Sequence, residues 1–309
     1  MGLPWLSGAV RFTKLIVLLL AGLIAGGFTA WALVNNSDIV ANINQGPVNA
    51  SNELAHRSFF LKSDVYDRGY EGADGTLELD SVSAGIVPHH LLANHKLGNF
   101  FGTLGAREQY DTIVLIGPDH MNRSYYHLAT SEASWDTPYG KVEPTSDIIN
   151  ELLGRSVIQV DEKIFTAEHS INGLVPFIRR SFPGARIIPI TVQANTSNES
   201  IDALATALNE ILPIRSLVLA SVDFAHYVSH EEAMRQNGVN IPLLQQMNPD
   251  LVNQLFVDSP QTVRAVLKYL QLREVGNYQL LDSSDSAEVT GEYDVPEVTS
   301  YITMYFGNK

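Results

Sequence analysis

The sequence contains no cysteine, and it has few positive charges for its size. Without a thiol, disulfides, thiolate zinc sites, iron–sulfur clusters and cysteine nucleophiles are all excluded. Any metal bound by this chain must therefore be held by histidine, aspartate or glutamate. Lysine and arginine number 20 against 34 aspartates and glutamates, a net charge of -14, and the sequence has no basic cluster. Because phosphate backbones are bound by clustered lysine and arginine, the composition argues against a nucleic-acid partner.

The longest apolar run lies near the N-terminus, at residues 15–34 (LIVLLLAGLIAGGFTAWALV). As a helix it would span roughly 30 Å, the thickness of a hydrocarbon core. Arg11 and Lys14 precede it without any acidic residue, which predicts a short cytoplasmic N-terminus (1–14), a single-pass membrane anchor and an extracytoplasmic globular part. The alternative is a cleaved signal peptide with Ala30–Ala32 as its cleavage site. Both alternatives predict export.

The rest of the chain, with 309 residues in total and 45% of them hydrophobic, can build a substantial core. Residues 35–80 are polar and aperiodic, which predicts a linker or lead-in, although Phe59–Leu61 and Tyr66 could pack on the domain edge. From residue 81 onward, β-branched apolar runs alternate with helical patterns, which predicts a single α/β domain (81–309) with a largely parallel central sheet flanked by helices. The predicted strands are 83–88, 111–118, 185–192 and 216–223, with late strands at 277–283 and 299–306.

Three helical segments are predicted between and after these strands. The first is 170–181. The second, 198–212, is opened by Thr196 with Glu199 three residues on, which is the pattern of a capping box. The third, 230–247, is preceded by Ser229 in the same pattern.

Histidines follow several of the predicted strands. His89 and His90 come after the first strand, His120 after the second, and Asp223 and His226 after the fourth. In open α/β sheets, ligands bind beyond the carboxyl ends of the strands. A single histidine at a strand end is more often a hydrogen-bonded core residue than a ligand. Several at the same edge predict a common site, and His169 at a predicted helix start adds a further imidazole.

The stretch GIVPHHLLANH (85–95) holds three of the nine histidines, and their spacing does not form a compact zinc motif. Because successive strand residues point to opposite faces, His89 is predicted to enter the site. His90 is either a hydrogen-bonding neighbour of the site or a helix cap, and His95 is predicted to lie on a helix surface.

Five motifs resemble those of the Memo family, also called AmmeMemoRadiSam system protein B. These are GIVPH (85–89), IGPDH (116–120), WDTPYG (135–140), AEHSINGLVPF (167–177) and SVDFAHY (221–227), followed by a similar YQLLDSSD (278–285). The family is similar in fold to class III extradiol ring-cleavage dioxygenases, which bind non-haem iron with two histidines and a carboxylate. The resemblance implies metal ligation by His89, His120 and His169, with Asp223 and His226 lining the same pocket.

The chain departs from the family pattern at several positions. Family members usually have Ala-Gly-Tyr after the first histidine, where this chain has 90–92 (HLL). They often have a second histidine in the place of Met121, and commonly glutamate in the place of Asn172. Some have cysteine in the place of Ala225.

The leading hypothesis is a membrane-anchored, metal-dependent enzyme with dioxygenase-like chemistry. Imidazole and carboxylate ligands suit Fe(II), with zinc or copper as alternatives. Glu168 or Asp223 would complete or orient the metal shell, and His226, with Asp223, would be the catalytic acid or base. The alternatives are a metal-dependent hydrolase and a non-catalytic module that binds a metal or a small-molecule or peptide ligand.

Overall fold

The structure, a computed structural model, describes residues 54–73 and 75–309. The predicted cytoplasmic segment (1–14), the predicted anchor (15–34) and the first part of the lead-in lie outside the described residues. Within the described part of the chain, every helix is too short or too polar to cross a bilayer. The anchor therefore stays a prediction from the sequence.

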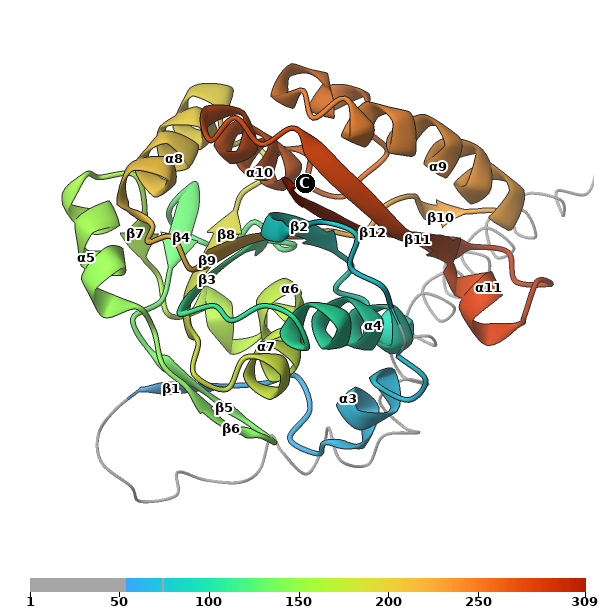
Figure 1. The fold of residues 1–309 in the computed structure, drawn as a ribbon, viewed down its shortest axis with the longest axis horizontal. Coiled ribbons are helices and arrows are strands. Elements are labelled where there is room, and N and C mark those ends of the chain that lie inside the picture. Colours follow the sequence, from blue (N-terminus) through green and yellow to red (C-terminus); the bar gives the residue numbers. More distant parts are fainter. Residues whose placement is uncertain (1–53, 74) are drawn as a thin grey trace, which may run out of the picture. The chain divides into compact units, whose positions relative to one another are not determined.

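A mixed, nine-stranded sheet forms the centre of the described domain (Figure 1). Its strands run in the order β10-β12-β2-β9-β3-β8-β4-β7, and β11 pairs with β12. The strands are β2 (Ser81–Val87), β3 (Thr112–Pro118), β4 (Leu128–Thr130), β7 (Gln159–Val160), β8 (Arg186–Val192), β9 (Ser216–Ser221), β10 (His226–Val228), β11 (Asn277–Asp285) and β12 (Val298–Asn308).

The middle of the sheet is parallel, as the continuous apolar runs predict. Strands β2, β9, β3 and β8 are parallel neighbours. The strands at both margins change direction, because β4 runs antiparallel to β8 while β12 runs antiparallel to β2, β10 and β11. The sheet is therefore less uniformly parallel than predicted, since the two late strands form an antiparallel pair on one edge of it.

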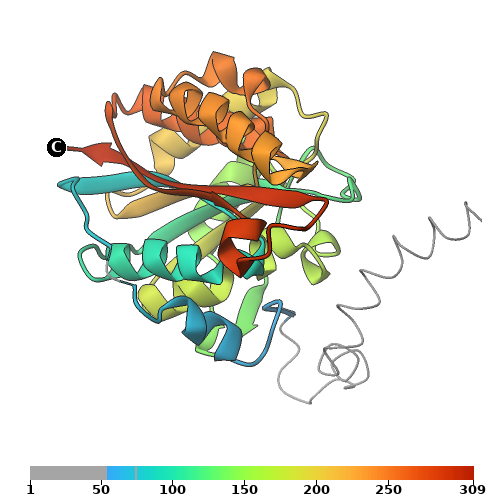
Figure 2. The ribbon, with the colours of Figure 1, turned by 90° about the vertical axis from the view of Figure 1, so that its right-hand side faces the viewer.

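Each central strand is buried on both faces. In β3, Ile113 and Leu115 pack into one hydrophobic cluster, whereas Val114 and Ile116 pack into the other. Helices α8, α9 and α10 cover one face of the sheet, and α4, α6 and α7 cover the opposite face (Figures 1 and 2). The helices are α3 (Asp64–Gly69), α4 (Asn94–Gly105), α5 (Ser146–Gly154), α6 (His169–Asn172), α7 (Val175–Ser181), α8 (Asn198–Ile211), α9 (His230–Gln245), α10 (Pro260–Leu272) and α11 (Ser286–Thr290), with 3-10 turns η1 (Leu91–Ala93), η2 (Ile164–Thr166) and η3 (Pro249–Gln254).

The lead-in predicted for 35–80 is, in its described part, a component of the domain. Strand β1 (Ala55–Arg57) pairs in parallel with β5 (Ser134–Thr137), which pairs with β6 (Gly140–Val142) to form a small second sheet. Tyr66 in α3 is fully buried. The predicted domain start at residue 81 is thus too late, because isolated aromatic side chains between polar residues make tertiary contacts that leave no periodic pattern.

Two helix starts differ from the sequence expectation. Ser197, rather than Thr196, caps α8 by accepting a hydrogen bond from the backbone N–H of Ser200. Thr196 instead donates its hydroxyl to the carbonyl of Gln193, so it closes the preceding turn. The predicted helix 170–181 is divided into α6 and α7. The cap by Ser229 at the start of α9 is confirmed.

Candidate metal centre

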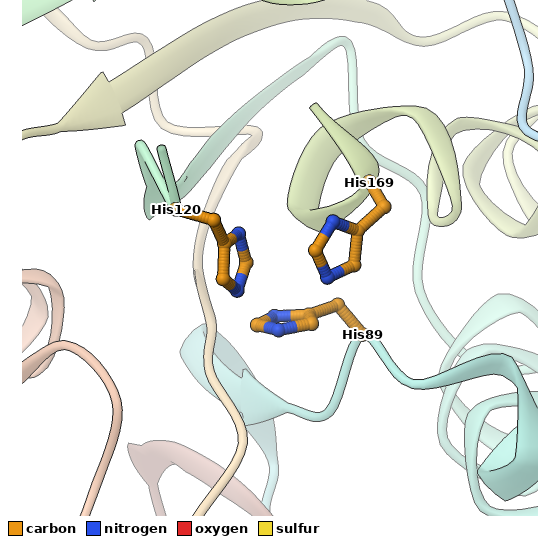
Figure 3. Close-up of side chains that lie close together, drawn as sticks. All are labelled: His89, His120 and His169. Atoms are coloured by element: carbon orange, nitrogen blue, oxygen red, sulfur yellow. The ribbon is translucent and has the colours of Figure 1, made fainter. Parts of the chain in front are cut away.

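Three imidazoles from separate segments meet at the carboxyl edge of the sheet (Figure 3). His89 follows β2, His120 follows β3, and His169 is the first residue of α6. One ring nitrogen from each lies within 4.8 Å of the other two. The ring centroids are 4.0 Å apart for His120 and His169, 4.8 Å for His89 and His120, and 5.1 Å for His89 and His169. This arrangement can hold a metal ion.

Close packing of α6 against β3 brings these segments together. A Cβ atom on Gly117 would lie 2.5 Å from the hydroxyl of Ser170, so only glycine allows this approach. The Ser170 hydroxyl donates to the carbonyl of Pro118 at 3.0 Å. Ser221, at the end of β9, donates to the carbonyl of Ser170 at 2.6 Å and lies 3.3 Å from Nδ1 of His89. Three strand ends are thereby tied to one helix start.

Glu168 orients His120. Its Oε2 accepts from the backbone N–H of His120 at 3.1 Å, and its Oε1 lies 2.8 Å from His120 Nδ1 and 2.9 Å from the backbone N of Ser170. Burial alone would raise the pKa of Glu168, but the hydrogen bond and charge of His120 and the Ser170 N–H lower it to about 2. A carboxylate at this position assigns the His120 proton to Nδ1 and leaves the lone pair on Nε2.

His89 is the most buried of the three imidazoles, with 2% of its surface exposed. Burial lowers its pKa to about 4, the neighbouring His120 and His169 act in the same direction, and Asp223 opposes them. His89 is therefore neutral at neutral pH, which is the form that ligates a metal.

Asp258 is a carboxylate at the centre that the sequence analysis missed. Its Oδ2 lies 3.3 Å from Nε2 of His89 and 3.8 Å from Nε2 of His120, and it accepts from the backbone N–H of Asp223 at 3.2 Å. Its Oδ1 is buried and has no hydrogen-bond partner among the described residues. Burial and the charge of Asp223 raise the pKa of Asp258 well above its usual value. A bound cation would stabilise the ionised form of such a buried carboxylate and would supply the partner that its Oδ1 lacks.

Asp223 and His226 adjoin the imidazoles in different ways. Asp223 accepts from the backbone N–H of His89 at 3.1 Å, and its Oδ2 lies 3.6 Å from the Nε2 of that ring. Nε2 of His226 is buried and makes no hydrogen bond to another described residue. Burial lowers the pKa of His226.

The other two histidines of the stretch 85–95 lie outside the cluster. His90 precedes η1 without forming a side-chain cap, and its Nδ1 lies 2.8 Å from the hydroxyl of Tyr301. Of its two predicted roles, the helix cap is therefore not formed, and the role of a neighbour that supports the site stays a prediction. His95 is exposed on α4, as predicted.

An open cavity of about 570 Å³ begins at the three imidazoles. Imidazole and carboxylate groups form one part of its lining, and apolar side chains form the rest. The lining residues are Phe59, Phe60, Val65, His89, His90, Leu91, Leu92, His120, His169, Gly173, Asp223, His226, Tyr227 and Thr299.

A family model described as Memo-like protein matches residues 71–305, which include the whole histidine cluster. The chain belongs to the Memo-like family. It is 28% identical over 240 residues to a MEMO1 family protein of Pyrobaculum arsenaticum, covering 74% of this chain and 84% of that protein. A MEMO1 family protein of Sulfurisphaera tokodaii is 27% identical over 238 residues, covering 72% and 82% of the two chains.

Among solved structures, an uncharacterized protein from Escherichia coli K12 matches this chain. It covers 72% of this chain and 99% of its own, with a TM-score of 0.44 and 13% sequence identity.

The positions at which this Memo-like chain departs from the family pattern have different surroundings. Asn172 is buried and does not line the cavity. Its side chain accepts from Nε1 of Trp135 at 2.9 Å and donates to the carbonyl of Phe165 at 2.8 Å, so it belongs to the scaffold. Ala225 is buried and Met121 is 61% exposed, and neither lines the cavity.

Proposed function

We propose that this Memo-like protein binds a divalent transition metal, with Fe(II) as the first choice. We propose further that it acts as a metal-dependent oxidoreductase with dioxygenase-like chemistry. The observation that carries the proposal is the position of Asp258, whose Oδ2 faces the Nε2 atoms of both His89 and His120. Two histidines and one carboxylate are the ligand set of non-haem Fe(II) oxygenases. His169 would be the third imidazole.

Three properties of the residues at the site favour metal binding. The Nε2 atom of His120 is available as a ligand because Nδ1 is engaged by Glu168. His89 is neutral at neutral pH. Asp258 has a buried oxygen without a described partner. Cysteine-free ligation of this kind suits iron, with zinc or copper as alternatives. When bound, iron would supply dioxygen activation, whereas zinc would supply an acidified water for hydrolysis.

The protein groups would do the proton chemistry. His226 lines the cavity with a buried, unpartnered Nε2, and its lowered pKa keeps it in the neutral, basic form at neutral pH. It would accept a proton from a substrate hydroxyl and return it later. Asp223 would orient His89 through its backbone N–H and hold negative charge beside the imidazoles. Glu168 would keep His120 in one tautomer.

Elemental analysis of the full-length protein after anaerobic purification tests the metal site. We expect about one transition-metal ion per chain. His120→Ala should remove the metal while the fold is retained, because a ring at a strand end contributes little to the core. His95→Ala is the matched control, since His95 is an exposed imidazole on α4 outside the cluster. Stoichiometric metal in His120→Ala, or none in the wild type, would overturn the proposal.

A non-catalytic binding module is the second candidate, and the apolar part of the cavity lining favours it. Oxygen-uptake and hydrolysis assays on catechol, ester and amide panels separate the two. Turnover by the metal-loaded wild type supports the enzyme. Absence of turnover on all of these substrates, with metal bound to the protein, supports the binding module.

For the segment 15–34 we propose a single membrane anchor that places the globular domain outside the cytoplasm. The support is the charge-free apolar run after Arg11 and Lys14. Fractionation followed by an alkaline wash should leave the protein in the membrane pellet, and protease added from the outside should digest the domain. A wash that releases the intact chain would contradict the anchor.

A further inference from the structure

The cavity beside the imidazoles has an apolar wall, formed by Phe59, Phe60, Val65, Leu91 and Leu92. Phe59 is 47% exposed and Leu92 is 40% exposed, although both are large apolar side chains. Exposed apolar groups gathered beside a few convergent polar groups are typical of a small-molecule site. The apolar wall therefore offers binding area next to the reacting groups.

The part of the wall that precedes α3 is held in place by hydrogen bonds. The backbone N–H of Phe59 donates to the carbonyl of Asn172 at 3.0 Å, and that of Phe60 donates to the hydroxyl of Tyr66 at 3.1 Å. The rings of Phe59 and Phe60 meet edge to face, with centroids 5.0 Å apart. A wall fixed in this way is formed before any ligand arrives, which lowers the entropic cost of binding.

Tyr227 adds a further aromatic ring to the cavity lining, and its backbone is constrained. Tyr227 lines the cavity, is 76% exposed and has a φ of 55°, in the left-handed region that side chains other than glycine rarely adopt. Residues held in this region cluster at ligand-binding sites. Its neighbour His226 also lines the cavity, and its buried Nε2 has no hydrogen-bond partner among the described residues.

The phenylalanines of the wall lie before the family match. The match begins at residue 71, so Phe59, Phe60 and Val65 come from a segment that precedes it. The imidazoles lie within the match. The wall is thus a place where this chain can select its ligand without altering the metal centre.

The charge of the site argues against an anionic ligand. Among the described residues that line the cavity there is no lysine or arginine. Asp223 lines it, Asp258 lies beside the Nε2 atoms of His89 and His120, and Glu168 lies beside Nδ1 of His120. In the metal-free protein, a carboxylate or phosphate on a ligand would meet these groups without a compensating cationic side chain from the lining.

We infer that the site accepts an uncharged phenol-type molecule, with its hydroxylated end at His226 and the imidazoles and its apolar substituent on the wall formed by Phe59 and Phe60. The ring would meet Phe59, Phe60 and Tyr227, and aromatic pairs favour edge-to-face contact. The inference deepens the proposed function by naming a substrate class, and it rests on that function for its catalytic meaning. Binding itself requires only the wall and the cavity.

Ligand-observed NMR with a matched pair of probes tests this preference in the full-length, metal-free protein. The probes are 4-ethylphenol and 4-hydroxyphenylacetate, which have nearly the same shape and differ in one carboxylate. We expect the wild type to bind 4-ethylphenol at least about tenfold more tightly, because the carboxylate of the anion would lie on the apolar wall, where no lysine or arginine of the lining can pair with it. Equal binding, or tighter binding of the anion, would overturn the inference.

Substitutions in one segment assign the effect to the wall. Phe59→Ala should weaken 4-ethylphenol binding by about five- to tenfold, the loss expected for removing one aromatic contact. Leu61→Ala is the matched control, because Leu61 is also apolar and 37% exposed but does not line the cavity. Phe59→Lys should shift the preference toward 4-hydroxyphenylacetate. Equal effects of Phe59→Ala and Leu61→Ala would show that the wall does not bind the ligand.

Metal content, measured on the same variants, keeps the two proposals apart. Phe59→Ala should retain the metal content of the wild type, since Phe59 is not a ligand. If the wild type binds 4-ethylphenol but no metal, the proposed function is wrong and the inference about ligand binding by the wall still holds. If the wild type binds metal but neither probe, the inference about ligand binding by the wall is wrong and the proposed metal centre still holds.

Discussion

Glu168 holds His120 at two points, the backbone N–H at 3.1 Å and the ring Nδ1 at 2.8 Å. Both contacts come from one carboxylate that also caps α6 through the Ser170 N–H. The position of His120 relative to His169, the first residue of α6, therefore depends on this side chain in addition to the Ser170–Pro118 hydrogen bond. The geometry of the metal centre depends on this carboxylate even though it is not proposed as a ligand.

Glu168→Gln should weaken metal binding by about 10- to 100-fold, the range seen when a group that orients a ligating histidine is lost. The amide keeps the size of the side chain but removes the charge that fixes the His120 proton on Nδ1. Chelator competition under anaerobic conditions measures the change. Glu162→Gln, which alters another carboxylate paired with a histidine, should leave metal affinity unchanged. An unchanged affinity in Glu168→Gln would show that Glu168 has no such role.

Asp258→Asn separates metal binding from stability. We expect the variant to lose stoichiometric metal, because the amide is a weaker ligand than the carboxylate. The metal-free variant should be at least as stable as the metal-free wild type, since burial and the charge of Asp223 disfavour an ionised Asp258 and the amide is neutral. Elemental analysis and thermal unfolding of both forms provide the two readouts. If Asp258→Asn retains the metal content of the wild type, Asp258 is not the carboxylate ligand. If the metal-free variant unfolds at a much lower temperature than the metal-free wild type, Asp258 has a structural role.

His226→Asn should reduce turnover by about 10²- to 10⁴-fold while leaving the metal content unchanged. The imidazole lines the cavity and has a nitrogen without a described partner, whereas the carboxamide of asparagine has no basic nitrogen and cannot take up a proton. Oxygen uptake with 4-ethylcatechol and elemental analysis of the same preparation measure the two properties. Loss of metal from this variant would mean that His226 is a ligand rather than an acid or base.

Much of the fold could be predicted from local patterns. The continuous apolar runs at β2, β3, β8 and β9 have a direct cause, since strands covered on both faces need apolar side chains on both. The same logic placed His89 and His120 together, because the ends of parallel strands share an edge. These two positions depend on strand direction alone.

Asp258 could not be predicted in the same way. It lies between η3 and α10 and follows no strand of the central sheet, so sequence position links it to no edge. A bridge between Phe224 and Val257 and the backbone hydrogen bond from Asp258 to Asp223 bring it to the site. Asp258 stands directly before Ser259 and Pro260, where a polar residue is expected at a helix start. Its residue type therefore gave no sign that it contacts the imidazoles.

The segment that carries Phe59 is attached to the domain by a partly buried pair, His56 and Glu162, which gives a pH-dependent prediction. His56 Nε2 lies 2.7 Å from Glu162 Oε2, and Glu162 also accepts from the Ser131 hydroxyl at 2.5 Å and the Glu132 backbone N–H at 2.9 Å. Burial alone would raise the pKa of Glu162, but these hydrogen bonds lower it below its usual value. The ionised form is thus favoured in the folded state, and its stabilisation is present above the unfolded pKa.

Glu162→Gln should therefore reduce the free energy of unfolding by about 1–2 kcal/mol at a pH of about 7, the cost of losing charged hydrogen bonds. The difference from the wild type should shrink as the pH falls below about 4.5 and through the lower folded pKa, because the wild-type carboxyl is then protonated as well. Urea unfolding at a series of pH values measures it. A difference that grows on acidification would have the wrong sign and would show that Glu162 is not stabilised in its ionised form.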